Sequence, residues 1–109
     1  MKVFNVMEKV KEGGEYILGY DETGSHACYM IYGVIAPGEK DRLLKPGKGH
    51  EEILLVLEGE FRLYGDCDVI LKKGQAIHVD GEHVCFIENI SDTEGVYVIA
   101  GGHSTVSHH

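Results

Sequence analysis

Three side chains in this sequence have the types and spacing of metal ligands. His50 and Glu52 open the stretch HEEILLVLEGE, and His83 ends the later run DGEH. Neutral imidazole nitrogens and carboxylate oxygens bind Zn²⁺, Fe²⁺, Ni²⁺ and Mn²⁺, and two histidines with one carboxylate leave coordination positions open for a substrate. The residue types therefore predict a divalent-metal site made of His50, Glu52 and His83.

The strand that follows Glu52 should place its carboxylate at the mouth of a cavity. The apolar run 53–57 is too short for a typical helix and is closely followed by Gly59, which predicts a buried strand and then a tight hairpin. Alternation along a strand puts Glu52, Leu54 and Val56 on one face. Because both faces are apolar, we expect a sandwich or barrel that covers this strand on both sides.

Short apolar runs separated by glycines continue along the whole chain. Fifteen glycines against two prolines are typical of an all-β domain. Strands are expected at 3–6, 15–19, 26–35, 67–71, 75–79, 84–89 and 95–100, the last two paired with each other, and a helical turn is expected at 7–12. We expect one domain over residues 1–109, with a core of about 15–100, a short N-terminal arm and a loose C-terminal tail.

Composition narrows the choice of partners. Ten basic and eighteen acidic side chains give a formal net charge of −8. This balance repels phosphate backbones and anionic lipid, so neither nucleic acid nor a membrane surface is an expected partner.

The sequence has no apolar run near the roughly 20 residues of a membrane span, and its N-terminus lacks the apolar core of a signal peptide. Three cysteines without a C-x-x-C pair fit reduced thiols, and we expect a cytoplasmic protein.

The run His26–Ile35 predicts a second subunit. Its alternate residues are apolar on both faces of the expected strand. In a single-layer surface sheet one face should be polar, so an apolar outer face is expected to be covered by another copy of the chain. We therefore predict a homodimer.

The stretch from Pro37 to Asn89 resembles the small single-domain cupins. Glu52, six further residues and then Gly59 match the second half of the first cupin motif. Gly74 to His83 is similar to the second motif, with His83 in the place of its metal-binding histidine. The resemblance implies an all-β, cupin-type jelly-roll barrel whose mouth often carries a divalent metal.

This sequence departs from both cupin motifs. Metal-binding cupins begin the first motif with two histidines spaced H-x-H, and Pro46 and Lys48 stand at those positions. In the second motif Asp80 replaces the usual proline, the turn before His83 is two residues shorter, and Asn89 follows His83 by six residues and not by four. The departures leave the expected fold in place, but they do not allow a metal-dependent activity to be carried over.

Further polar side chains are expected around the same cavity. Lys48 is placed either to contact an anionic group or to pair with Glu52, and His26 and His78 have the chemistry of additional ligands or of acid–base groups near neutral pH. His103 follows two glycines and is expected to be exposed. The predicted ligand pocket consists of Lys48, Tyr32, His78, Cys85 and His26.

The leading hypothesis is a small cupin-like protein that binds a small polar ligand in the barrel mouth, with or without one divalent metal. One alternative is a metal-free, non-enzymatic binding or sensing module. Another is a metal-free isomerase or epimerase that works through His78 or His83 with a tyrosine. The two histidines that end the chain are either native or the remnant of a purification tag.

Overall fold

The computed structural model describes residues 1–10 and 14–104. Within these residues the chain forms two single-turn helices and nine strands: a 3₁₀ turn Met7–Lys9, β1 Glu15–Leu18, α1 Tyr20–Thr23, β2 Cys28–Ile35, β3 Arg42–Leu44, β4 His50–Glu58, β5 Glu60–Gly65, β6 Val69–Lys72, β7 Ala76–Asp80, β8 Cys85–Asn89 and β9 Gly95–His103. In the part of the chain so described, no helix has the length and apolarity to cross a membrane.

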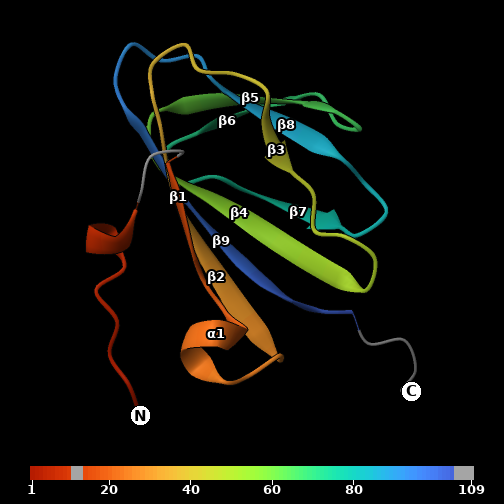
Figure 1. Ribbon diagram of the computed structural model, residues 1–109. Helices are drawn as coiled ribbons and strands as arrows, with labels where there is room; N and C mark the ends of the chain where they lie inside the picture. The colour runs from red at the N-terminus through yellow and green to blue at the C-terminus, as the bar shows by residue number, and fades with distance from the viewer. Residues whose placement is uncertain (11–13, 105–109) are drawn as a thin grey trace.

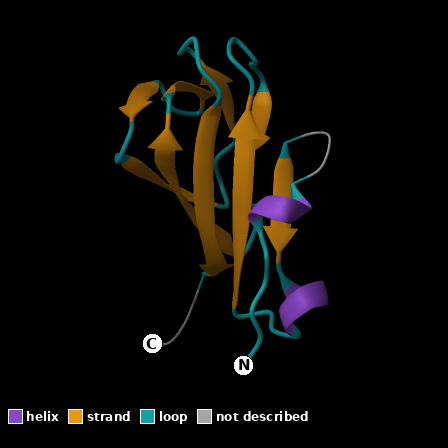
Figure 2. Cartoon of the chain, turned by 90° about the vertical axis from the view of Figure 1, so that its left-hand side faces the viewer, coloured by secondary structure: helices purple, strands orange, loops and turns teal. Residues whose placement is uncertain are grey.

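Two antiparallel sheets face each other and enclose the core (Figure 1). The first sheet has the strand order β1-β2-β9-β4-β7, and the second has the order β3-β8-β5-β6. The helical turns lie outside the two layers (Figure 2). Consecutive strands such as β4 and β5 belong to different sheets, so crossings between the layers close the barrel. The predicted all-β jelly roll is confirmed.

The prediction of a tight hairpin at Gly59 is wrong. β4 pairs with β7 and β9, whereas β5 pairs with β6 and β8. Gly59, at a φ of +95°, bends the chain from one sheet into the other, a conformation that glycine adopts without steric cost. The predicted pairing of the last two strands is wrong as well, because β8 pairs with β3 and β5 while β9 pairs with β2 and β4.

The ends of the chain differ from the sequence prediction in smaller ways. Residues 3–6 do not form a strand, and the predicted helical turn is a 3₁₀ turn at Met7–Lys9. The end of that predicted turn, residues 11 and 12, and most of the expected loose tail, 105–109, lie outside the described residues. β3 was not predicted, because three residues carry too little alternation to be recognised without their partner strand β8.

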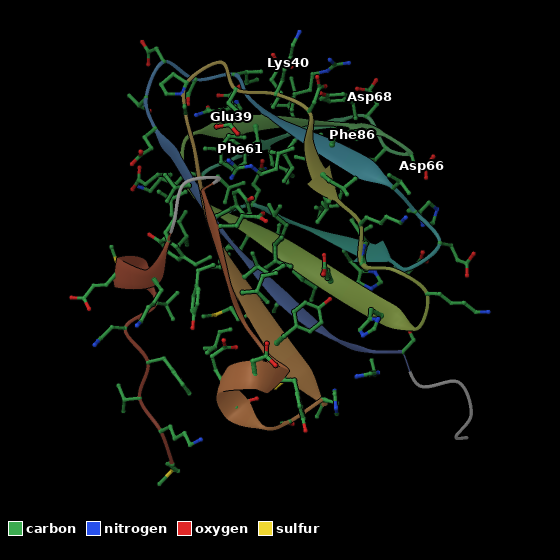
Figure 3. The ribbon with its side chains drawn as sticks, viewed as in Figure 1. Glu39, Lys40, Phe61, Asp66, Asp68 and Phe86 are labelled. Carbon is green, nitrogen blue, oxygen red and sulfur yellow. The ribbon has the colours of Figure 1, made fainter. Side chains whose placement is uncertain are left out.

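The core lies between the sheets and confirms the alternation expected in β4. Leu54 and Val56 are fully buried next to Glu52, whereas Ile53 is 48% exposed on the outer face. Phe61, labelled in Figure 3, packs edge-to-face on Tyr97 with the ring centroids 5.9 Å apart. Each such buried side chain stabilises the fold by roughly 1.5–3 kcal/mol.

The outer face of the first sheet is also apolar. Tyr32 lies directly opposite Val98, and Ile53 lies directly opposite Ala100. These side chains and their apolar neighbours are partly or largely exposed, and the full set is Met30, Tyr32, Val34, Ile53, Leu55, Val96, Val98 and Ala100. The described residues therefore leave this face accessible to solvent.

Asn89 fixes the end of β8 against the rest of the barrel. Its side chain is fully buried, and its amide nitrogen donates to the carbonyl oxygens of Ile35 at 3.0 Å and of Thr93 at 2.8 Å. Its side-chain oxygen accepts from the backbone and the hydroxyl of Ser91. These bonds join the β8–β9 connection to the end of β2.

Replacing Asn89 with alanine should destabilise the fold. Asn89→Ala leaves the buried carbonyls without their donor, and we expect the free energy of unfolding to fall by about 2–4 kcal/mol. Urea denaturation measures the change. Asn5→Ala, at an exposed position, is the matched control and should change stability by less than about 0.5 kcal/mol. Equal effects of the two substitutions would contradict the role given to Asn89.

Candidate ligand-binding site

A pocket of about 300 Å³ opens where β4 begins and β9 ends. Helix α1, the loop before β4 and the end of β9 lie at the same end of the molecule (Figure 1). The pocket is lined by Ile17, Gly19, Tyr20, Ser25, His26, Cys28, Tyr29, Pro46, His50 and His103. Three imidazoles and two phenols therefore converge on one small opening, which we call the mouth pocket.

Beneath this pocket the hydroxyl of Tyr29 donates a hydrogen bond to the carboxylate of Glu52. Glu52 is only 5% exposed. Burial raises the pKa of the Glu52 carboxyl; the hydrogen bond from Tyr29 lowers it in part, and the nearby Glu15 raises it further. Burial, followed by the bond to Glu52, also raises the pKa of the Tyr29 hydroxyl. Both groups thus hold their protons more firmly than usual.

Gly101 makes the contact between Tyr29 and Glu52 possible. Both residues lie directly opposite Gly101, Tyr29 on β2 and Glu52 on β4, with β9 between them. A Cβ atom at position 101 would lie 2.2 Å from Cζ of Tyr29. Only glycine lets the ring cross the intervening strand, so the three residues form one cross-strand row that ends in a hydrogen bond.

Aromatic contacts hold the other side chains of the mouth pocket. His50 and His103 are directly opposed on β4 and β9, and their ring centroids are 4.6 Å apart with an interplanar angle of 42°. The ring of His50 meets Tyr29 edge-on at 6.0 Å. His26 stacks on Tyr20 at 3.9 Å. The imidazoles are therefore packed into the rim of the pocket.

The structure does not bring the three predicted metal ligands together. His50 and Glu52 lie at the start of β4, but His83 lies in the turn between β7 and β8, where its Nδ1 is 2.6 Å from Oδ1 of Asp80. Across residues 1–10 and 14–104, no three His, Cys, Asp or Glu side chains are grouped so that they could hold a metal ion. In this arrangement His50, Glu52 and His83 do not fit a shared ion.

The departures from the second cupin motif explain the position of His83. Asp80 stands where a proline is usual, and its carboxylate accepts from the backbone N–H of Glu82 as well as contacting the His83 ring. The hydrogen bond to His83 lowers the pKa of Asp80. A compact, charged turn therefore holds the His83 ring against Asp80, and among the described residues His83 does not form a group of three metal-binding side chains with His50 and Glu52.

Of the five predicted pocket residues, only His26 lines the mouth pocket. Tyr32 lies on the outer face of β2, because Ile31 and Ile35, and not Met30, continue the inward row. His78 is exposed on β7, and its Nε2 is 2.8 Å from Oε1 of Glu51. These two placements correct the sequence prediction: both faces of β2 are apolar, so composition could not decide which face turned inward.

The remaining two predicted pocket residues lie elsewhere. Lys48 is exposed in the loop before β4, and Glu52 bonds to Tyr29 in place of the ion pair considered for it. Cys85 is buried beside a second pocket of about 160 Å³ that Cys67 also lines. Burial and the neighbouring Cys85 thiol raise the pKa of Cys67 to about 12. This thiol is therefore protonated near neutral pH and is a poor nucleophile.

The two acidic residues on either side of Cys67 face solvent. Figure 3 labels Asp66 and Asp68 at the rim of the second sheet. Both are exposed, and Asp66 accepts a hydrogen bond from the backbone N–H of Val84 at 2.8 Å. Both lie in the connection between β5 and β6, and neither lines the mouth pocket.

Sequence reasoning missed Tyr29 and His103 as site residues. The predicted strand ended at Ala100, so Gly101, Gly102 and His103 were assigned to the loose tail and His103 had no predicted role in the site. β9 in fact continues to His103. A glycine inside a strand marks a close approach of another group, and this signal could have pointed to the Tyr29 ring.

Comparisons with known proteins support the fold but not an activity. No protein-family model matches the sequence, and no curated protein matches it. A cupin protein from Bacteroides fragilis superposes with a TM-score of 0.73 at 15% identity, covering 100% of this chain and 86% of that chain. The fold is that of a cupin. The cupin resemblance seen in the sequence is therefore confirmed for the architecture.

Other cupin-fold structures match equally well. A Cupin 2 conserved barrel domain protein from Salinispora arenicola has a TM-score of 0.73 at 15% identity, covering 95% of this chain and 90% of that chain. Oxalate oxidase, solved with the substrate analogue glycolate, has a TM-score of 0.76 at 16% identity, covering 96% of this chain and 61% of that chain. At these identities the similarity shows the cupin fold alone.

Glu52 should make the stability of the protein depend on pH. Because its pKa is raised in the folded protein, the folded chain holds this proton more tightly than the unfolded chain. The free energy of unfolding should therefore fall as pH rises from the ordinary glutamate pKa of about 4.3 through the raised value. Glu52→Gln keeps an acceptor for Tyr29 without titrating, so it should lose this decline.

Urea denaturation of both proteins between about pH 4 and pH 8 tests this expectation. The stability of the Glu52→Gln variant relative to the native sequence should increase with pH. Glu82→Gln, at an exposed position, is the matched control and should follow the native profile. A native profile parallel to that of Glu52→Gln would show that the carboxyl pKa is not raised.

Proposed function

We propose that this protein binds a small polar ligand in the mouth pocket, above the Tyr29–Glu52 pair. The observation that carries the proposal is a buried carboxyl hydrogen-bonded to a tyrosine that lines an open pocket of about 300 Å³. Ligand sites are typically preformed, apolar in most of their lining, and supplied with a few converging polar groups. This volume lies at the lower end of the usual range, which favours a small molecule.

The groups around the rim favour a ligand that carries a carboxylate or a hydroxyl. His26, His50 and His103 supply imidazole nitrogens, and the exposed Lys48 lies close in sequence to Pro46, which lines the pocket. These donors offset locally the net charge of −8. Oxalate oxidase, which shares the fold, was solved with glycolate. Small hydroxy acids and oxo acids are accordingly the first candidates.

Proton transfer by a metal-free isomerase or epimerase is the second candidate function. A tyrosine bonded to a carboxyl of raised pKa is a suitable acid–base pair beside a ligand pocket. In this version Tyr29 and Glu52 take the roles that the sequence suggested for a tyrosine with His78 or His83. A sensing module would use the same pocket without turnover.

Binding of small acids should depend on Tyr29. In an NMR titration with glycolate and a panel of small hydroxy and oxo acids, we expect saturable shifts of the His50 and His103 ring signals. Tyr29→Phe removes the hydroxyl that bonds to Glu52 beneath the pocket and should weaken the affinity of any binder about tenfold. Tyr32→Phe, on the opposite face of the same strand, is the matched control and should bind normally.

The same titration distinguishes the candidate functions. Incorporation of solvent deuterium into a bound acid would identify proton transfer, and Glu52→Gln should abolish it while binding persists. Binding without exchange would indicate a sensing module. Binders whose affinity responds equally to Tyr29→Phe and Tyr32→Phe would place the ligand outside the mouth pocket and refute the proposal.

We also propose that a second copy of the chain covers the outer face of the first sheet. This face carries partly exposed apolar side chains from β2, β9 and β4, including Met30, Tyr32 and Val98, and Ile53 of β4 is 48% exposed. Contiguous apolar patches of this kind on soluble domains commonly mark protein interfaces. Charged residues are few in this row, which suits the core of a homodimer interface.

Light scattering at micromolar concentration tests the homodimer. We expect a particle of twice the 12.0 kDa of one chain, and Ile53→Lys should convert it to a monomer because the charge would be buried without a partner. Ile70→Lys, at a position 54% exposed on the second sheet, is the matched control and should remain dimeric. A 12.0 kDa particle for the native sequence would refute the homodimer.

A further inference from the structure

The outer face of the second sheet carries a row of apolar and aromatic side chains, and we propose that it binds an arginine-bearing apolar segment of another protein. Leu43 on β3 lies directly opposite Phe86 on β8, and Phe86 lies directly opposite Tyr64 on β5. Alternation turns their neighbours Leu44 and Cys85 into the core, so these three side chains point outward. We call them the outer aromatic row. The proposal does not depend on the ligand of the mouth pocket.

The two rings of the outer aromatic row form a small platform. Tyr64 and Phe86 stack with their centroids 5.7 Å apart and an interplanar angle of 29°. Gly65 adjoins the platform, and a Cβ atom there would lie only 3.3 Å from Cδ2 of Phe86. Both rings are partly exposed, and Leu43 beside them is 52% exposed. Aromatic side chains placed in this way supply much of the contact area of protein interfaces.

Within residues 1–10 and 14–104, the outer aromatic row remains accessible to solvent. Helix α1 and the N-terminal arm lie beside the first sheet (Figure 1). In the next row along the same face, Ile70 lies directly opposite Arg62 and is largely exposed. The outer aromatic row and Ile70 therefore form an apolar patch that is available to a partner.

Arg62 shows which kind of side chain this face accepts. Its guanidinium carbon lies 5.1 Å from the centroid of the Tyr64 ring. Its nitrogens lie 3.9 Å from a carboxylate oxygen of Asp68 and 4.0 Å from one of Glu88. A guanidinium over an aromatic ring and beside carboxylates is stabilised by cation–π attraction and by charge. The same surroundings suit a second guanidinium, supplied by a partner.

Carboxylates near Tyr64 remain available for such a cation. Asp41 and Asp66 are exposed, and in the part of the chain that the structure describes neither takes part in a salt bridge. The carboxylate of Asp41 accepts from the Tyr64 hydroxyl, which holds it beside the ring. Asp68 is largely exposed and makes only a long contact with its arginine. Figure 3 labels Asp66, Asp68 and Phe86 on this sheet.

The charges favour a basic partner over a second copy of the chain. Of the two cations on the strands of this face, Arg62 contacts acids of the same sheet, and Lys72 lies directly opposite Glu60. The exposed Lys40 and Lys45 flank β3, at the sheet edge opposite to β6. A two-fold contact between two such faces would place like charges close together. A basic segment instead complements the carboxylates.

A synthetic hexapeptide that alternates leucine with arginine, blocked at both ends, is the probe. We expect saturable NMR shifts of the backbone amides of Leu43, Tyr64 and Phe86, and weaker binding as salt rises. Leu43→Ser should weaken the affinity about fivefold, because it removes apolar area from the outer aromatic row. Val3→Ser, at an exposed position in the N-terminal arm, is the matched control and should bind normally.

A charge-matched pair of variants separates a specific site from general attraction. Asp68→Asn should weaken the affinity about threefold. Asp21→Asn, at an exposed position on α1, removes the same charge elsewhere and should leave the affinity unchanged. Equal effects of these two substitutions would show that only the net charge of −8 attracts the probe, and would overturn the proposal.

Three other outcomes would also overturn it: no saturable shifts, shifts confined to the first sheet, or equal binding of a hexapeptide with glutamate in place of arginine. If Leu43→Ser fails to fold by circular dichroism, Leu43→Thr replaces it with the same expected loss, because threonine suits a strand.

The probe should leave the oligomeric state measured by light scattering unchanged, because the first sheet takes no part in its binding. Glycolate titrated into the same protein reports on the mouth pocket separately. Failure of the peptide titration alone would therefore refute the outer aromatic row as a binding site and leave the proposed function standing.

Discussion

The hydrogen bond from Tyr29 to Glu52 crosses an intervening strand, and it exists because Gly101 has no side chain. Without this partner the carboxyl of Glu52 would be buried unsatisfied, which typically costs several kcal/mol or forces the group to remain protonated. The bond satisfies the carboxyl and lowers its pKa in part, while burial keeps that pKa above its ordinary value. The chemistry available at the mouth of the barrel follows from this one row of residues.

A second tyrosine uses the same geometry two rows deeper in the barrel. Tyr97 lies against Gly33, where a Cβ atom would be 2.2 Å from its Cζ, and its hydroxyl donates to Glu15. An arginine, Arg42, also reaches Tyr97, at 3.2 Å. The charges of the inner row are thus compensated. At the outer row the nearby Glu15 instead raises the pKa of Glu52, so the two rows are electrostatically linked but only the outer one opens to a pocket.

The residues of the cupin-like motifs do not share one role in this structure. Asn89, in the second motif, is fully buried and holds the β8–β9 connection. His83, in the same motif, contacts the carboxylate of Asp80 in the turn between β7 and β8. The cupin scaffold is therefore present, while the side chains that gather at the mouth come from β1, α1, β2, β4, β9 and the loops before β2 and β4, in a combination that neither motif describes.

The sequence by itself determined the all-β class, the cupin-type architecture and the inward direction of Glu52, because alternation along a strand is local and one face of β4 begins with a carboxylate. It could not determine which face of β2 points inward. Both faces of β2 are apolar, so whether Tyr29 or Tyr32 points into the barrel was decided only by how β2 pairs with the other strands of the sheet. It also could not show that Gly101 lies within a strand, since the ring that needs this space comes from a residue 72 positions earlier. Contacts at that separation are decided only when the strands have paired.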